Sequence, residues 1–186
     1  MPGLLSERRL VILDRDGVIN QDSDEFVKSA DEWIPLDGSI DAVARLSSAG
    51  FTIAVASNQS GLARGLLTEA ALSAMHRKLR KLVAAAGGRV DRISICPHGP
   101  DVDCACRKPR PGMLLELGEH YDTPLDGVPV IGDSLRDLQA AASAGALPIL
   151  VRTGNGAKTE LELPPEFSTV AIFDDLAAAA TMLAGR

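Results

Sequence analysis

Short apolar runs alternate with longer stretches of helical periodicity along most of the chain. Runs rich in Val, Ile and Leu, bounded by polar residues or glycine, predict strands over 8–14, 51–57, 92–96, 128–132, 147–151 and 169–173. Between these runs, apolar residues spaced three and four apart predict helices that begin near Ser39, Thr68, Pro111, Ser134 and Asp174 or Asp175. Because strands and helices alternate, the pattern predicts an α/β fold with a doubly wound (Rossmann-like) parallel sheet.

Residues 19–37 show no sustained period, and we interpret them as a polar loop in which Trp33 is a packing anchor. The helix after Thr68 carries several Lys and Arg residues, which indicate a solvated face. On the same helix we interpret His76 as a surface or packing histidine.

A chain of 186 residues is long enough for one full core and too short for two, so we expect a single domain over 1–186.

The composition argues against some classes of molecule as binding partners of the protein. The chain is 46% hydrophobic and 24% charged, as in an ordinary soluble globular protein. A net charge of −6, 3% aromatic residues and the lack of a basic run argue against nucleic acid. Neither a run of roughly 18 apolar residues nor a signal-peptide pattern is present. We therefore expect a cytoplasmic protein with no membrane partner, and a monomer because no large apolar stripe remains unassigned.

Two carboxylates end the first predicted strand. Asp14 and Asp16 follow the run Leu10-Val-Ile-Leu, and Gly17 lets the chain turn tightly after them. At the carboxyl end of a parallel strand, such residues project into the crevice where open α/β sheets bind ligands. Two acids this close repel each other unless a cation joins them. The pair therefore favours Mg²⁺-assisted nucleophilic chemistry, and the alternative is an acidic turn without chemical function.

Polar clusters also follow three later elements, and a parallel sheet brings such loops to one edge. Together the clusters contain what phosphoryl transfer needs. Asp14 would attack phosphorus, and Asp16 would protonate the leaving oxygen and then deprotonate water. Ser57 and Lys108 would bind the phosphoryl oxygens. Asp133 with Asp14 would hold Mg²⁺, a hard cation that prefers oxygen ligands.

This set resembles the haloacid dehalogenase-like phosphatase superfamily. The D-x-D-G-[TV] motif of that superfamily corresponds to Asp14-Arg-Asp16-Gly-Val18, its second-motif hydroxyl to Ser57, its lysine to Lys108, and its acidic motif to Gly132-Asp133-Ser-Leu-Arg-Asp137. The resemblance covers about residues 8–155. It implies an aspartyl-phosphate intermediate and a Mg²⁺ site of Asp14, Asp133 and the backbone carbonyl of Asp16. Asp137 either contacts the residues that form the site, without touching the substrate itself, or is a charge on the helix surface.

A second cluster combines sulfur and nitrogen ligands. Residues 96–106, which we name the zinc loop, contain Cys96, His98, Cys104 and Cys106. Three thiolates and one imidazole match a tetrahedral Zn²⁺ site with no open position, so we expect a structural zinc. It would position Arg107 and Lys108, which follow immediately. Free cysteines and an unrelated histidine are the alternative.

The intervals between the motifs are too short for a cap domain, so we expect a capless fold with an open site. Within the superfamily the chain resembles the D-glycero-D-manno-heptose 1,7-bisphosphate 7-phosphatases of nucleotide-activated heptose (lipopolysaccharide core) synthesis. That resemblance rests on Asp14-Arg-Asp16-Gly-Val-Ile-Asn20, Ser57-Asn58-Gln59-Ser60-Gly61 and Cys106-Arg107-Lys108-Pro109. It implies that Arg107 binds the second phosphate of a small phosphorylated sugar, and that Asp22, Asn58, Gln59, Ser60 and Lys108 contribute to the substrate site.

Two other functions fit part of the pattern. Histidinol-phosphate phosphatases share the short Cys-x-His-x₅-Cys-x-Cys spacing, although their second motif typically continues Asn-Gln-Asp-Gly, whereas this chain has Asn58-Gln59-Ser60-Gly61. A catalytically silent, zinc-stabilised binding module would require the decay of a motif, yet Asp14, Lys108 and Asp133 are all intact. The sequence therefore favours the heptose bisphosphate phosphatase.

Overall fold

The computed structural model describes residues 9–23 and 25–185. Its strands form one six-stranded sheet: β1 (Arg9–Leu13), β2 (Phe51–Asn58), β3 (Arg92–Cys96), β4 (Pro129–Gly132), β5 (Leu147–Val151) and β6 (Ala171–Phe173). All six predicted strands are confirmed, and none of their described ends is shifted by more than two residues. Arg8, predicted to start the first strand, lies outside the described residues, as does the start of the predicted domain.

Helices follow the strands, and all but α5 lie where the periodicity predicts them: α1 (Ser39–Ser48), α2 (Glu69–Ala85), α3 (Gly112–His120), α4 (Leu135–Ser143), α5 (Gly156–Leu161) and α6 (Leu176–Ala184). A short 3₁₀ helix spans Pro165–Phe167. The six-residue α5 is not among the predicted elements, because it is too short to show a helical period. In the part of the chain that the structure describes, no helix has the length and apolar character needed to cross a membrane.

The strand order is β3-β2-β1-β4-β5-β6, and every pair is parallel. This order confirms the doubly wound sheet. The chain leaves β1 toward β2 on one side and returns to β4 on the other, so the order reverses at β1. Open α/β sheets bind ligands beyond the carboxyl ends of the strands at such a reversal. The topology therefore places Asp14, the residue after β1, at the expected ligand site.

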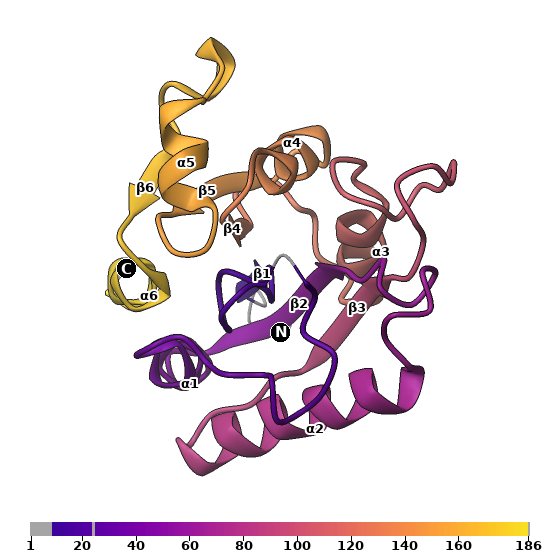
Figure 1. Cartoon of the computed structure of the whole chain (residues 1–186). Helices are drawn as coiled ribbons and strands as arrows, with labels where there is room; N and C mark the ends of the chain where they lie inside the picture. The colour runs from indigo at the N-terminus through magenta and orange to yellow at the C-terminus, as the bar shows by residue number, and fades with distance from the viewer. Residues whose placement is uncertain (1–8, 24, 186) are drawn as a thin grey trace.

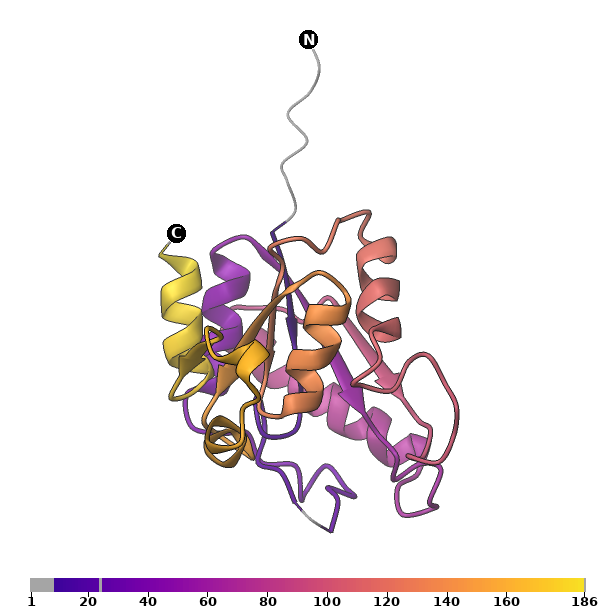
Figure 2. The same ribbon diagram turned by 90° about the horizontal axis from the view of Figure 1, so that it is seen from above.

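Two helical layers cover the sheet (Figure 1), with α1, α2 and α6 on one face and α3 and α4 on the other. In β1, Val11 and Leu13 face the first layer, whereas Leu10 and Ile12 face the second. A strand buried on both faces reads as a continuous apolar run, which is why β1 is evident in the sequence. Figure 2 shows α1 and α6 side by side at the edge of the first layer.

Two short connections keep the site open. Among the described residues, α1 is the helix between β1 and β2, and α2 is the helix between β2 and β3. Neither connection holds a cap domain, as predicted. Residues 19–23 and 25–37 belong to a loop that packs on the core through Trp33, which is fully buried, so its predicted anchoring role is confirmed. Lys78 of α2 also holds this loop, because its Nζ donates to the carbonyls of Ala30 and Trp33.

Candidate active site

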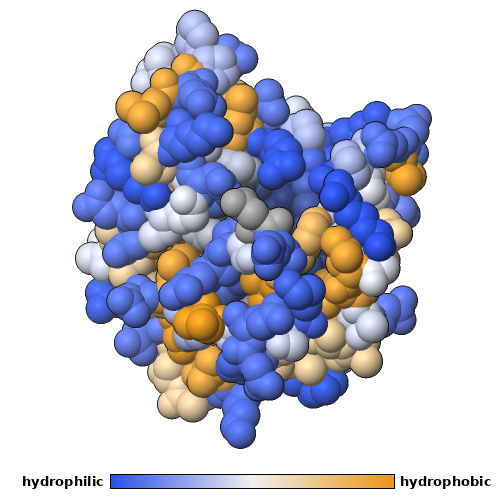
Figure 3. Space-filling view, viewed as in Figure 1, coloured by the Kyte–Doolittle hydropathy of each residue, from blue (hydrophilic) through white to orange (hydrophobic). Residues whose placement is uncertain are grey.

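A polar cavity of about 290 Å³ opens at the carboxyl ends of the strands. Figure 3 shows a hollow in this face, surrounded mainly by hydrophilic residues. The cavity brings together ten residues predicted from four separate parts of the sequence: Asp14, Asp16, Asp22, Ser57, Asn58, Gln59, Ser60, Arg107, Lys108 and Asp133. The sheet topology therefore assembles the predicted phosphoryl-transfer residues around one space.

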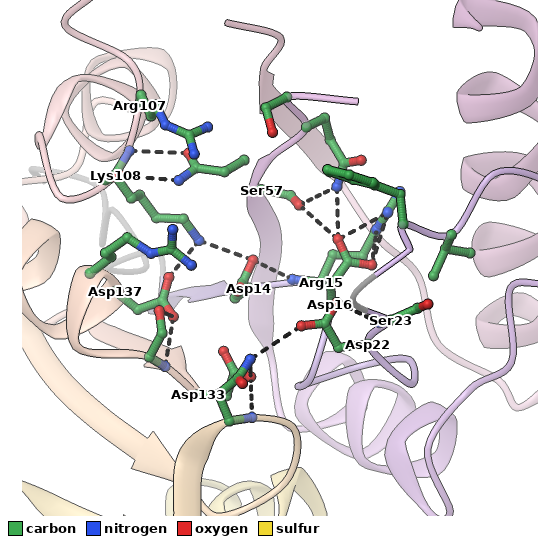
Figure 4. A pocket seen from close by; sticks show the side chains of 18 of the residues that line it. Asp14, Arg15, Asp16, Asp22, Ser23, Ser57, Arg107, Lys108, Asp133 and Asp137 are labelled. Carbon is green, nitrogen blue, oxygen red and sulfur yellow. Dashed lines mark hydrogen bonds and ion pairs between the residues drawn. The ribbon is translucent and has the colours of Figure 1, made fainter. Parts of the chain in front are cut away.

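Lys108 links the carboxylates at the base of the cavity (Figure 4). Its Nζ lies 3.0 Å from Asp14 Oδ1 and 2.6 Å from Asp137 Oδ1, and it donates to the carbonyl of Ala56 at 2.7 Å. Lys108 and Asp137 are almost completely buried. Asp137 also accepts from the backbone and hydroxyl of Ser134 in a capping box that starts α4. Asp137 is therefore a buried partner of Lys108, and the alternative of a helix-surface charge is wrong.

The carboxylates outnumber the lysine that they share. Burial raises the pKa of Asp14 well above 3.8; Lys108 opposes that shift, while Asp137 and Asp133 add to it. Burial and the charge of Asp137 together raise the pKa of Asp133 to about 7. Burial lowers the pKa of Lys108, but Asp137 and Asp14 outweigh burial and raise it. The site therefore holds more negative charge than Lys108 neutralises, a condition that a bound cation relieves.

Asp133 is held in a fixed orientation close to Asp14 and Asp137. Its Oδ2 accepts from the backbone N–H of Asn155 at 2.8 Å. Gly17 and Gly154, both with positive φ, pack so closely that a Cβ at either position would overlap Asp133 Oδ2. One oxygen each of Asp14, Asp133 and Asp137 lies within 4.8 Å of the others. An oxygen-rich, electron-rich set of this kind suits a hard cation such as Mg²⁺.

Asp16 is bound by several donors from the protein. Arg15 donates from Nε at 3.1 Å and from Nη2 at 2.9 and 3.0 Å. Asn20 donates to Oδ1 at 2.9 Å and Gln59 to Oδ2 at 2.8 Å. Burial raises the pKa of Asp16, but Arg15 and the hydrogen bonds outweigh burial and hold it below 3.8. Asp14 and Asp16 therefore differ sharply although they are two residues apart, an arrangement that lets two acids take different roles.

The remaining predicted residues contact one another around the cavity. Asn58 holds the backbone of Lys108, because its Oδ1 accepts from Lys108 N at 3.1 Å and its Nδ2 donates to Lys108 O at 3.0 Å. The amide of Gln59 donates to Ser57 Oγ at 2.7 Å. Arg107 donates to the carbonyl of His98 at 3.2 Å, which connects the zinc loop to the cavity. These contacts fix the backbone on which the polar side chains of the cavity are displayed.

The four predicted zinc ligands converge. Sγ of Cys96 lies 3.7 Å from Sγ of Cys104 and 3.1 Å from Sγ of Cys106. His98 turns Nδ1 toward the same thiols, at 3.3 Å from Cys106. A tetrahedral site with Zn–S bonds of about 2.3 Å has sulfur atoms about 3.8 Å apart, so the cluster is close to the size that zinc needs. All four groups have a ligand atom within 4.8 Å of the others, a clustering that favours a shared metal ion over an unrelated histidine.

Several cavity residues are absent from the sequence prediction. Arg15, Arg64, Arg136 and Asn155 line the cavity together with the predicted set. Arg15 stands between the two predicted aspartates, and this position in the sequence could have identified it as a cavity residue. Arg136 lies within the acidic motif at the start of α4, but the motif assigns it no role. Arg64 and Asn155 lie on loops, and only the packing of these loops brings them to the cavity.

A Rossmann-like sheet with two aspartates after β1 and a lysine–aspartate pair beside them defines a haloacid dehalogenase-like hydrolase. Comparisons with known families agree. A family model described as polynucleotide kinase 3 phosphatase matches residues 9–135, and a model of HAD-like hydrolases matches residues 105–179.

Individual relatives narrow the family further. A D-glycero-beta-D-manno-heptose-1,7-bisphosphate 7-phosphatase of Pseudomonas aeruginosa is 57% identical over 95% of this chain and 98% of its own. The crystal structure of a D,D-heptose 1,7-bisphosphate phosphatase from Bordetella bronchiseptica, complexed with magnesium and phosphate, is 58% identical, with a TM-score of 0.90 over 94% of this chain and 97% of that one. The enzyme from Burkholderia thailandensis is 41% identical, with a TM-score of 0.75 over 96% of this chain and 100% of that one. The chain belongs to the family of heptose 1,7-bisphosphate 7-phosphatases.

Proposed function

We propose that the chain is a Mg²⁺-dependent phosphatase that hydrolyses the C7 phosphate of D-glycero-β-D-manno-heptose 1,7-bisphosphate. The cavity that joins Asp14, Asp16, Lys108 and Asp133 is the observation that carries this proposal. The names of the relatives support the sugar and its β anomer. A place in the synthesis of nucleotide-activated heptose follows from the same substrate.

Asp14 is the proposed nucleophile. Its Oδ1 accepts from the backbone N–H of Arg15 at 2.7 Å and faces Lys108, which fixes the orientation of the carboxyl group. The other oxygen is the one available to attack the phosphorus atom. As the bond between that oxygen and phosphorus forms, the bond from phosphorus to the C7 oxygen breaks, and an aspartyl-phosphate results.

Asp16 is the proposed general acid and base. Asp16 takes up a proton when the negatively charged phosphate binds beside it, because a like charge raises the pKa that Arg15 and the hydrogen bonds otherwise hold below 3.8. In the first step that proton goes to the departing C7 oxygen, so the sugar leaves as an alcohol. In the second step Asp16 takes a proton from water as the water oxygen bonds to phosphorus and the bond to Asp14 breaks. Inorganic phosphate leaves, and both aspartates return to their starting states. The position of Asp16 supports this role, since it stands on the same turn as Asp14 and contacts Ser57 and Gln59.

Lys108 and Ser57 are the proposed phosphate-binding residues, since both line the cavity next to the aspartates. Asp14, Asp133 and the backbone carbonyl of Asp16 are the proposed Mg²⁺ ligands. Asp137 is not included, because Lys108 and Ser134 engage its two oxygens. A bound Mg²⁺ supplies positive charge that neutralises the phosphoryl oxygens and the surrounding carboxylates. Lys108 supplies a fixed second charge that stays in place without the ion.

A structural zinc at Cys96, His98, Cys104 and Cys106 is part of the proposal. Burial raises the pKa of the Cys104 thiol, but hydrogen bonds, first of all that from the backbone of Arg107, outweigh burial and lower it to about 7. Burial, followed by the neighbouring thiols, raises the pKa of Cys106 to about 12, so the three thiols do not all ionise by themselves. A bound zinc would supply the positive charge that stabilises them as thiolates. The zinc loop would then hold Arg107 at the rim of the cavity through the hydrogen bond to His98.

Arg107 is the proposed site of the C1 phosphate, with Asp22, Asn58, Gln59 and Ser60 around the sugar. A guanidinium suits a phosphate that does not react, because its planar donors bind two oxygens at once. Asp22 lies across the cavity from the zinc loop, where Asn155 Nδ2 donates to its Oδ2 at 3.2 Å. The cavity thus offers a reacting phosphate site and a separate cation for the second phosphate.

We also propose that the chain acts as a monomeric single domain in a reducing compartment such as the cytoplasm. The clustered cysteines and histidine support this, since a zinc site of this kind needs its cysteines as thiolates, which a reducing compartment preserves. Light scattering during gel filtration tests the monomer: one mass near 19.5 kDa is expected, and twice that mass would refute it.

The decisive experiment measures phosphate release from both heptose bisphosphate anomers and from histidinol phosphate, with Mg²⁺ and with EDTA. We expect release from the β anomer, dependent on Mg²⁺ and at least about 100-fold more efficient than from histidinol phosphate. The opposite ranking would replace the proposed substrate by histidinol phosphate. Asp14→Asn is the matched control, and it should abolish release while the circular dichroism spectrum is unchanged.

A second variant tests the proposed C1 phosphate site. Arg107→Lys keeps the charge but loses the paired donors. We expect a higher KM for the bisphosphate and a nearly unchanged KM for the heptose 7-phosphate, which lacks the C1 phosphate. Equal changes for both substrates would show that Arg107 does not bind that phosphate.

A further inference from the structure

Arg15 is a charged side chain in the interior of the protein. Its side chain is 1% exposed, and it forms the ion pair with Asp16 described above. Its remaining terminal nitrogen, Nη1, lies 3.4 Å from Nε2 of His76 on α2. His76 is separated from Arg15 by 61 residues in the sequence, so the packing of α2 against the β1 turn creates this contact.

The chemistry of the pair fixes the state of His76. A guanidinium has donors and no acceptor, so the imidazole nitrogen that faces it must carry a lone pair. His76 is therefore neutral, with its proton on Nδ1. Burial, and then the charges of Arg15 and Arg80, lower the pKa of His76 to about 4, which agrees with a neutral ring. His76 thus serves Arg15 as a hydrogen-bond acceptor, and its interpretation as a mere surface or packing histidine is incomplete.

We propose that His76 is a positioning residue for the acid–base steps, because it holds Arg15 in the orientation that places the carboxyl group of Asp16. This inference rests on the phosphatase function proposed above and adds a residue to it. Three donor contacts from Arg15 reach Asp16, and the acceptor at His76 holds the opposite end of the same planar group. A planar group held at both ends cannot rotate without losing contacts at each.

Loss of the hydrogen-bond acceptor at His76 would change the orientation of the Asp16 carboxyl group more than that of Asp14. Without His76, Nη1 of Arg15 is a buried donor with no partner at that end, and leaving such a donor unsatisfied is costly. The guanidinium would turn toward other acceptors, and Asp16 would follow it. Asp14 is fixed independently by Lys108 and by the backbone N–H of Arg15. Proton transfer should therefore suffer while substrate binding and attack on phosphorus are retained.

A substrate pair separates this effect from a general loss of structure. The C7 oxygen of the sugar is a poor leaving group and needs the proton of Asp16, whereas 4-nitrophenolate is stable as an anion and does not. Single-turnover release of the alcohol, measured with enzyme in excess, reports the first step alone. Heptose bisphosphate and 4-nitrophenyl phosphate are therefore compared on each variant.

We expect His76→Ala to slow release of the heptose 1-phosphate about 10-fold, because general acid catalysis contributes on the order of 100-fold or more and misplacement removes part of it. Release of 4-nitrophenolate should change less than about twofold, and KM for the heptose substrate should be unchanged. His76→Gln, whose side-chain oxygen can accept from Arg15 in place of Nε2, should restore most of the rate. Lys81→Ala, an exposed substitution on the same helix, is the matched control.

Equal slowing of both substrates by His76→Ala would show a merely structural role and would overturn the inference. It would also be overturned by a normal rate in His76→Ala, or by a His76→Gln variant as slow as His76→Ala. All of these results leave the wild-type enzyme active, so they leave the proposed function intact. A wild-type protein that releases no phosphate would instead refute the proposed function and this inference with it.

Discussion

Asp137 offers a direct test of the buried charge arrangement. One of its oxygens lies 2.6 Å from Lys108 Nζ, and the other accepts from Ser134 N at 3.0 Å. In Asp137→Asn an NH₂ group replaces one of these oxygens. Whichever way the amide turns, the NH₂ group meets a donor, either the ammonium of Lys108 or the backbone N–H of Ser134. The substitution therefore breaks the pair although its shape is nearly the same.

The magnitude follows from the burial of both partners. Lys108 is 4% exposed and Asp137 is 2% exposed, and removing one partner of a buried ion pair typically costs about 3–5 kcal/mol. Relief of the repulsion that Asp137 exerts on Asp14 and Asp133 offsets part of the loss. We therefore expect a loss of about 3 kcal/mol in the free energy of unfolding. In a protein of this size that loss lowers Tm by roughly 6 to 12 °C.

Urea unfolding without added Mg²⁺, followed across pH, is the assay. Burial raises the pKa of Asp137, but Lys108 outweighs burial and lowers it below 3.8. A carboxyl group with a lowered pKa contributes stability above its unfolded-state pKa and loses it as pH falls through the folded-state value. The difference between wild type and Asp137→Asn should therefore be complete at neutral pH and shrink as pH falls below 3.8.

A neutral-pH difference below about 1 kcal/mol, the typical value for an exposed ion pair, would refute this reasoning. A difference that does not change on acidification would refute the assignment to the charge of Asp137. Asp126→Asn, at an exposed site, is the control and should match wild type.

Three further predictions concern the metal sites and the loop before α1. Gly154→Ala should weaken Mg²⁺ activation measured by titration, because its Cβ would overlap Asp133 Oδ2; Gly87→Ala, with a similar positive φ and open space around it, should not. Cys104→Ser should remove zinc, measured by elemental analysis, and lower activity; full activity without zinc would contradict the proposed role. Lys78→Ala should cost about 2 kcal/mol in urea unfolding through two lost charge-assisted hydrogen bonds; an unchanged midpoint would contradict this.

The fold was largely predictable because its strands are short, apolar and buried on both faces. The continuous run at β1 and the period of α2 are local signals, so the sequence alone identified them. The alternation of strands and helices predicted a doubly wound sheet, but it did not predict the order in which the strands pair. The six-residue α5 escaped prediction because one and a half turns do not establish a period.

Some residues of the candidate site were also predictable from local spacing, whereas others were not. Aspartates two residues apart after a strand, and cysteines and a histidine within one loop, carry their chemistry in local spacing. Asp137 remained ambiguous in the sequence, because the choice between a surface charge and a buried partner depends on whether Lys108 reaches it from another loop. That contact joins Lys108 and Asp137, which are 29 positions apart in the sequence.

The sequence by itself predicted all of the strands and most of the helices, and it supplied the candidates for the nucleophile, the acid–base residue and the ligands of two metals, because each depends on residue types at short fixed spacing. The tertiary structure decided which groups orient those residues: Asn155 and two glycines around Asp133, and His76 behind Arg15. Such contacts join side chains far apart in sequence, and they exist only where packing brings a donor within hydrogen-bond distance of an acceptor. Periodicity and motifs contain no information on those distances.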